Sequence, residues 1–328
     1  ISIDNQCNVV MTNLIVRNNT AMERGGGVFA WGNVTLSLRN SEISNNSAPH
    51  AGGVFLGYSI VPQIDNCTIA GNTATDYGGG LVFQNLLEND NVILTESIVT
   101  GNSAPTGAQV HIAAYPNTWQ EGNSSRTTIS YSNVEMDDEN DYFESDAGIT
   151  AWGGGMLDID PGFVDTETGD YRILASSFLI SAGHPDSTDV DGSRSDLGAH
   201  PYETDNTGTV WYVSADGSDS DGMGTESSPF KTIQAGINLA SVGGTVTVAE
   251  GTYQENVIVR GRNLILSGSG KESTIIDANL NGSGIVATSL ESFNYNHGSI
   301  ENFTVRNLSI VNGSGRQDFT QPDGDNDP

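Results

Sequence analysis

Residues 69–83 read IAGNTATDYGGGLVF, and this stretch joins two short motifs that recur along the first 131 residues of the chain. The first motif is aliphatic-x-[Asn/Gly]-Asn-[Ser/Thr]-Ala, and it occurs at residues 16–21, 43–48, 69–74 and 99–104. The aligned asparagines are Asn19, Asn46, Asn72 and Asn102, so the steps are 27, 26 and 30 residues. A period of this length is typical of repeat proteins, in which each repeat is one supersecondary unit.

Each repeat contains three short apolar stretches with no helical pattern between them. A glycine cluster followed by an apolar strand begins at Gly25, Ala51, Gly78 and Gly107. Because strands this short cannot bury an apolar face alone, we expect each to pair with its copy in the next repeat, about 4.8 Å away. The sequence therefore predicts an all-β fold, a parallel β-helix. The third strand of each coil is expected at residues 34–38, 62–65, 91–95 and 127–131.

The recurrent asparagine has a physical role at a bend between strands. Asparagine tolerates the left-handed αL conformation, and its side chain can hydrogen-bond to the asparagine of the next coil. The glycine cluster permits positive φ at a second bend. We therefore predict that Asn46 and Asn72 lie at equivalent corners of adjacent coils with their side chains aligned.

The Asn-x-Ala and Gly-Gly-x-aliphatic-Phe repeats resemble the pectate-lyase-like superfamily of right-handed parallel β-helix proteins. They are also similar to the repeats of polymorphic outer-membrane proteins, which are surface adhesins and autotransporter passengers. The resemblance covers about residues 9–131. It implies a right-handed coil and an extracellular or cell-surface location in a bacterium.

The rest of the chain predicts an end segment and a second module of the same kind. Residues 158–203 resemble the segment that ends many secreted bacterial β-helix proteins, on motifs such as Asp196-Leu197-Gly198-Ala199. Since the last coil has an open apolar face and unpaired strand edges, we expect this segment to cover it. The predicted units are residues 1–203 as the C-terminal part of one β-helix, 204–208 as a linker, and 209–328 as the N-terminal cap and first coils of a second.

The second module is predicted to begin with a strand and a short amphipathic capping helix. Ser228 is the expected N-cap and Pro229 the first helical residue, because these residue types favour those positions. Gly243-Gly244 would end the helix. The apolar face at helical spacing comprises Phe230, Ile233, Ile237 and Ala240.

The charge excludes some partners and favours one cofactor. Twelve Lys+Arg against 41 Asp+Glu leave a net charge of −29, which would repel the phosphates of nucleic acids. No stretch approaches the 18 apolar residues of a transmembrane segment. Residues 121–208 hold 19 Asp+Glu against three Arg, and oxygen-rich clusters suit Ca²⁺, although a solvated acidic face is the alternative. The candidate Ca²⁺ ligands are Asp216, Asp219 and Asp221.

The resemblance also implies polysaccharide lyases and hydrolases, so catalysis is an alternative. Lyases of this fold use a basic residue beside acidic Ca²⁺ ligands, yet no lysine precedes Lys231. The Asn-Thr-Asp and Gly-His-Gly motifs of the hydrolases are missing. We therefore assign no catalytic residue. A Ca²⁺-assisted polysaccharide lyase or glycoside hydrolase, and a purely structural spacer, stay open as alternatives.

Aromatic residues follow the glycine-cluster strand in three of the four coils. They are Trp31, Tyr58, and the pair Tyr115 and Trp119. Rings spaced along one side of a stack can pack against sugar faces, although packing of loops over the strand edge is the alternative. We therefore predict a non-catalytic, adhesin-like module, a monomeric part of a longer protein, that binds extracellular polysaccharide or surface glycan through these four residues.

Overall fold

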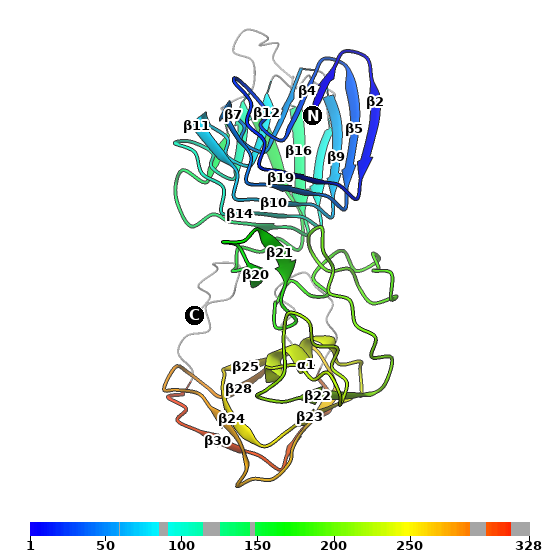
Figure 1. Cartoon of the computed structure of the whole chain (residues 1–328), viewed down its shortest axis with the longest axis vertical. Coiled ribbons are helices and arrows are strands. Elements are labelled where there is room, and N and C mark those ends of the chain that lie inside the picture. The colour runs from blue at the N-terminus through cyan, green and yellow to red at the C-terminus, as the bar shows by residue number, and fades with distance from the viewer. Residues whose placement is uncertain (59, 85–90, 114–124, 145–147, 289–299, 316–328) are drawn as a thin grey trace.

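The computed structural model describes residues 1–58, 60–84, 91–113, 125–144, 148–288 and 300–315. In its first half the chain winds as a coil with three main sides, and each side is a parallel sheet that takes one strand from each turn (Figure 1). We call these sheets A, B and C. The predicted all-β parallel β-helix is thereby confirmed.

The strands of each sheet follow in spatial order. Sheet A comprises β1 (Ser2–Asp4), β4 (Val28–Trp31), β8 (Val54–Gly57), β12 (Leu81–Gln84), β15 (Val110–Ala113) and β18 (Tyr142–Glu144). Sheet B comprises β2 (Asn8–Thr12), β5 (Val34–Arg39), β9 (Ile60–Asp65), β13 (Asn91–Thr95), β16 (Ser125–Ser130) and β19 (Gly148–Trp152). Sheet C comprises β3 (Ile15–Arg17), β6 (Glu42–Ser44), β10 (Thr68–Ala70), β14 (Ile98–Thr100) and β17 (Asn133–Val134), and β7 (Ser47–His50) pairs with β11 (Thr73–Tyr77) beside it.

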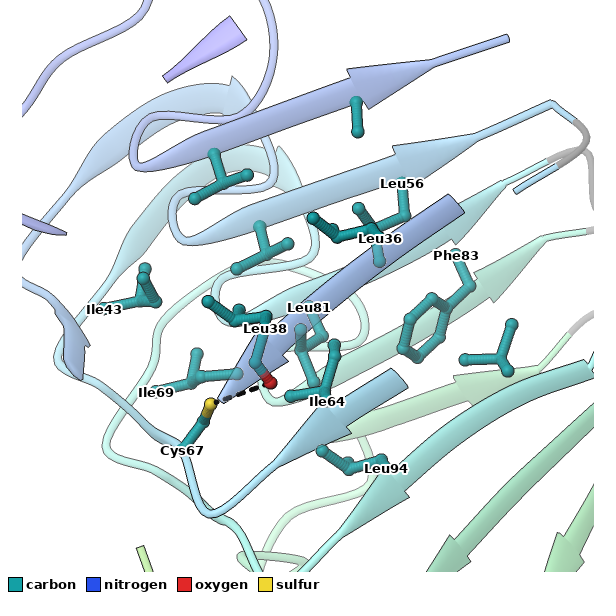
Figure 2. Close-up of a cluster of buried hydrophobic side chains, with 14 of the residues drawn as sticks. Leu36, Leu38, Ile43, Leu56, Ile64, Cys67, Ile69, Leu81, Phe83 and Leu94 are labelled. Atoms are coloured by element: carbon teal, nitrogen blue, oxygen red, sulfur yellow. Dashed lines mark hydrogen bonds between the residues drawn. The ribbon is translucent and has the colours of Figure 1, made fainter. Parts of the chain in front are cut away.

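The core runs along the axis of the coil and is built from alternate residues of each strand. Leu36 and Leu38 of β5 are fully buried, as is Leu56 of β8, and Figure 2 shows them among apolar side chains of neighbouring coils such as Ile64 and Phe83. The Cys67 thiol lies 3.5 Å from the Leu38 carbonyl oxygen, and burial raises the pKa of Cys67 to about 12. This cysteine therefore packs as a small apolar side chain.

The recurrent asparagines form a ladder along one corner. Asn19 Nδ2 donates to Asn46 Oδ1 at 2.9 Å, Asn46 Nδ2 to Asn72 Oδ1 at 3.0 Å, and Asn72 Nδ2 to Asn102 Oδ1 at 2.9 Å. Asn102 Nδ2 in turn donates to Gln109 Oε1 at 2.8 Å. The predicted alignment of Asn46 and Asn72 is therefore confirmed.

The left-handed conformation lies one residue earlier than we expected. Positive φ occurs at Asn18, Asn45, Gly71 and Gly101, each of which directly precedes a ladder asparagine. The left-handed residue turns the chain, and the next residue then places its amide in the ladder, where Asn72 is fully buried. The Asn/Gly alternation in the motif thus marks the αL position, because these two residue types tolerate it.

The end segment lies elsewhere than predicted, because it runs back along the outer face of sheet C. Gly198 N donates to Glu96 O at 2.9 Å and Ala199 N to Thr68 Oγ1 at 3.0 Å, so neighbouring residues contact successively earlier coils. On this outer face Ile98 is fully buried in a cluster with Ile173, Leu179 and Leu197 of the segment, and Thr68 accepts a hydrogen bond from it, so apolar and polar contacts together hold the segment there. The segment includes the antiparallel pair β20 (Phe163–Asp165) and β21 (Asp170–Ile173), which lies against sheet C in Figure 1.

A second stack of parallel strands occupies residues 210–311. Its sheets are ordered β22-β23-β26-β29, β24-β27-β30 and β25-β28. Within the described parts of the chain, no helix is long and apolar enough to cross a membrane. The strands are β22 (Val210–Val213), β23 (Thr245–Val248), β24 (Gly251–Gln254), β25 (Val257–Arg260), β26 (Leu264–Gly268), β27 (Thr274–Asp277), β28 (Ile285–Thr288), β29 (Phe303–Arg306) and β30 (Ser309–Val311).

The capping helix α1 (Ile233–Leu239) is present but begins later and ends earlier than predicted, with Ala240 as its C-cap. Its N-cap is Thr232, whose side chain accepts from Ala235 N at 3.2 Å. Phe230 cannot be helical because its N–H donates to Tyr212 O and its carbonyl accepts from Ser214 N, both at 2.9 Å. The four residues of the predicted apolar face, Phe230, Ile233, Ile237 and Ala240, are all buried.

Candidate ligand-binding face

The outer face of sheet A carries a row of mostly aromatic side chains. Successive side chains of a strand point to opposite faces, so residues next to core residues such as Leu56 lie outside. Phe55 and Val82 form an apolar cluster separate from the main core, against which Phe29, Trp31 and Tyr77 pack. One register position across β4, β8, β12, β15 and β18 holds Phe29, Phe55, Val82, His111 and Phe143.

Trp31 and Tyr58 form a stacked pair at one edge of this face. Their ring centroids are 6.0 Å apart with an interplanar angle of 16°, and Trp31 also stacks on Phe55 at 6.2 Å. Tyr58 is 47% exposed, whereas Trp31 is half-buried. Gly57 pairs with Trp31, and a Cβ at Gly57 would lie 2.6 Å from the indole ring. The missing side chain of Gly57 therefore makes room for Trp31.

Two of the four predicted binding residues are thus in contact. Tyr115 and Trp119 lie outside the described residues. At the register of Trp31 and Gly57, the third coil places Gln84. The predicted row of aromatic residues has its gap in this coil, at residues 84–87, of which 85–87 lie outside the described residues.

Arg24 lies over the same rings, a position that no pattern in the sequence predicts. Its guanidinium carbon is 5.4 Å from the Phe55 ring centroid and 5.8 Å from that of Trp31. Arg24 Nη2 also pairs with Glu23 Oε1 at 3.4 Å. A cation over a ring face is attracted by the negative charge of the π system, so Arg24 helps to hold Trp31 in place.

A second set of rings lies beside the first. His50, Tyr77, His111 and Phe143 stack in that order, with successive centroids 4.5 Å apart. Burial lowers the pKa of His111 to about 4, so its imidazole is neutral at physiological pH. His50 Nδ1 lies 3.4 Å from Asp76 Oδ2. The sequence alone does not predict this column, in which His50 and Tyr77 each directly precede a residue with positive φ.

The three candidate Ca²⁺ ligands have different surroundings. Asp219 is buried, and its Oδ1 accepts from Lys231 N at 2.8 Å and Thr232 N at 3.1 Å, before the first turn of α1. Asp221 Oδ1 pairs with Arg172 Nη1 at 3.3 Å. Asp216 is exposed, and its N–H donates to Ser214 Oγ at 3.4 Å. Across the described residues, no group of three or more His, Cys, Asp or Glu side chains is arranged to hold a metal ion.

Comparisons with known families match both halves of the chain. Residues 1–160 match the family described as "Right handed beta helix region". Residues 215–313 match the family described as "Protein of unknown function (DUF1565)". No curated protein and no solved structure matches the chain. Together with the parallel sheets of both stacks, these matches fit a parallel β-helix superfamily, and residues 1–160 match its right-handed form.

Proposed function

We propose that the outer face of sheet A binds glycan and that the chain is an adhesin-like module of an extracellular or cell-surface protein. The stacked pair of Trp31 and Tyr58 is the observation that carries the proposal. Apolar C–H faces of sugars pack well against aromatic rings, whereas hydroxyl groups need polar partners at the rim. Glu23 and Arg24 supply such partners next to Trp31.

The environment of Trp31 favours binding because it fixes the ring in advance. Phe55 lies against one side of the indole, Gly57 leaves the space that the ring occupies, and Arg24 lies over it. A side chain that is already ordered loses little conformational entropy when a ligand arrives. Tyr58 then adds an exposed ring to an ordered one.

The charge distribution favours a neutral glycan. The chain carries a net charge of −29, and the side chains of Glu23 and Asp76 beside this face are 75% and 56% exposed. A polymer of uronates would be repelled unless cations bridged it. Neutral hexose polymers avoid this cost.

At the face of sheet A, the contacts of Arg24 favour binding over lyase chemistry. A lyase would need a basic residue beside acidic side chains from adjacent coils. Arg24 instead pairs with Glu23 of its own coil and packs over Trp31 and Phe55. A guanidinium in that position supports the ring platform.

A glycan array with the whole chain, run beside lyase assays on pectin and alginate, tests the proposal. We expect the wild-type chain to bind neutral glycans. The Trp31→Ala/Tyr58→Ala variant should lose this binding while its melting temperature stays nearly unchanged. Trp152→Ala is the matched control, since Trp152 is a 43% exposed tryptophan on sheet B. Equal binding by both variants, or lyase activity without binding of neutral glycans, would contradict the proposal.

A further inference from the structure

A cavity of about 540 Å³ lies where the end segment meets the second stack. One wall comes from residues 180–207, and the other from residues 238–242 at the end of α1 together with Gly261 and Arg262. Direct contacts fix the two walls, because Asn238 Nδ2 donates to Ala175 O at 3.1 Å and to Ser177 O at 2.8 Å. The cavity is therefore built into the fold and is separate from the face of sheet A.

Arg262 is a charged group with neutral partners in this cavity. Its Nη1 donates to Ala240 O at 2.9 Å and its Nη2 to Ser181 Oγ at 3.4 Å. Among the residues that the structure describes, Arg262 forms no ion pair within 4 Å. Burial lowers the pKa of Arg262, so the guanidinium lacks the stabilisation that a buried charge requires.

Two acids, Asp191 and Asp196, line the cavity with Arg262, and neither supplies that stabilisation in full. Asp191 Oδ1 accepts from Ser193 N at 2.9 Å and from Ser193 Oγ at 2.6 Å. Asp196 Oδ1 accepts from Ser181 N at 2.7 Å, and its Oδ2 accepts from Tyr202 N at 2.8 Å, so both oxygens have partners in the backbone. Burial raises the pKa of Asp196 to about 7, so this carboxyl is partly neutral at physiological pH. Arg194 also lines the cavity, and its charge adds to that of Arg262. Two arginines thus share one cavity in a chain with only twelve basic residues.

The remaining wall suits an organic molecule with polar edges. Trp211 and Leu239 contribute apolar surface, whereas Asn206 and Ser241 contribute amide and hydroxyl groups. Guanidinium groups recognise carboxylate and sulfate with paired hydrogen bonds. We propose that this cavity binds a small organic anion, a sugar-sized ring that bears one carboxylate or sulfate group, with the anionic group at Arg262 and Arg194.

Calorimetric titration of the whole chain at constant ionic strength tests this site with glucuronate, glucose and inorganic sulfate as probes. We expect saturable binding of glucuronate that survives Trp31→Ala and that glucose does not displace. Arg262→Gln should weaken it about tenfold or more, as expected for losing hydrogen bonds from a charged group. Arg262→Lys should keep part of the affinity. Arg306→Gln is the control, because Arg306 is exposed on β29 and donates to Ser267 Oγ.

Three outcomes would overturn the site: no saturable binding of glucuronate, unchanged affinity in a folded Arg262→Gln variant, or binding of sulfate alone. The last result would mean a site for inorganic anions only. Should Arg262→Gln fail to fold by circular dichroism, Arg194→Gln decides instead. A folded Arg194→Gln protein with the affinity of the wild type would reject the proposal.

Discussion

Asn46 donates two hydrogen bonds to the single Oδ1 of Asn72, one from its backbone N–H and one from its Nδ2, both at 3.0 Å. Asn72 repeats this arrangement toward Asn102. Each side-chain oxygen in the ladder therefore satisfies two donors of the coil before it. Removal of the Asn72 amide leaves the buried Asn46 N–H without its acceptor and takes from Asn102 Oδ1 one of its two donors.

Asn72→Leu should lower the free energy of unfolding by about 1–3 kcal/mol, because Asn72 is fully buried and its loss leaves polar groups unpaired. Asn19→Leu is the matched control, since Asn19 is the exposed first rung of the ladder. Urea denaturation of the two variants measures the difference. An equal loss of unfolding free energy in both variants would show that burial of the asparagine side chain does not matter.

The left-handed position before each ladder asparagine gives a second prediction. Gly71 and Gly101 have φ of 66° and 62°, so alanine at either position is strained. A Cβ at Gly71 would also lie 2.5 Å from Asn45 Oδ1 and from Tyr171 Oη, whereas at Gly101 the nearest atom is 3.9 Å away.

We therefore expect Gly101→Ala to cost about 1 kcal/mol of unfolding free energy, and Gly71→Ala to cost clearly more. The extra loss comes from the Tyr171–Asn45 hydrogen bond of 2.9 Å, which ties the end segment to sheet C. Thermal unfolding of both variants tests this. If Gly101→Ala proves the more damaging change, the clash at Gly71 is not real.

The fold was predictable where the repeat period carries the information. A step of 26 to 30 residues with one asparagine per step specifies the stack and the ladder. The position of the end segment was not predictable, because Glu42, Thr68 and Ile98 sit in strands of three residues whose inner and outer faces cannot be told apart by pattern. Only the folded coil shows that these three side chains lie on the outer face, where the end segment contacts them.

The binding face was predictable in part for a similar reason. Trp31 and Tyr58 could be found because large aromatic residues follow the glycine-cluster strand in three of the four coils. Arg24, His50 and Tyr77 could not, since they share a position before an αL residue but no chemical type. Their common role appears only when the coils are stacked.

The acidic stretch predicts a response to ions. Burial raises the pKa of Asp158, and the charges of Asp137, Glu135 and Asp141 raise it further, so these carboxylates repel one another. Calcium relieves such repulsion only where ligands converge, whereas salt screens all exposed charges. We expect residues 121–208 to be stabilised by Ca²⁺ or by NaCl. A melting temperature that EGTA leaves unchanged and NaCl raises would reject specific Ca²⁺ binding.

Two aspartates near the cavity predict a fall in stability as pH rises. Burial raises the pKa of Asp196 to about 7 and that of Asp189 to about 6. An aspartate in the unfolded chain titrates near about 3.9, so between about pH 4 and 7 the folded protein binds more protons than the unfolded chain. The contribution of these groups to stability therefore decreases through that window and is constant above it.

Urea midpoints at pH 5 and pH 8 measure this decrease, and Asp189→Asn should reduce it, since the amide oxygen can still accept from Asp196 N. Glu42 affects the pH dependence of stability in the opposite direction, and it does so at lower pH. Burial raises its pKa, but hydrogen bonds from His200 and Ser44 outweigh burial and leave the pKa lowered. A wild-type midpoint that rises between pH 5 and 8 would contradict the prediction for the two aspartates.

The space at Gly57 gives the sharpest test of the binding face. Gly57 is not among the residues with positive φ, so alanine is compatible with its backbone, but its Cβ would lie 2.6 Å from the Trp31 ring and 3.1 Å from the Phe55 ring. Gly57→Ala should therefore displace the indole ring of Trp31 and weaken glycan binding about tenfold. It should also lower the free energy of unfolding by about 1 kcal/mol through overpacking. In the Trp31→Ala background the same substitution should cost clearly less, because the closer of the two contacts is gone and only that with Phe55 remains. This double-mutant cycle separates displacement of Trp31 from general damage to β8. If Gly57→Ala lowers stability equally with and without Trp31, the glycine serves the strand and not the ring, and the platform loses its structural basis.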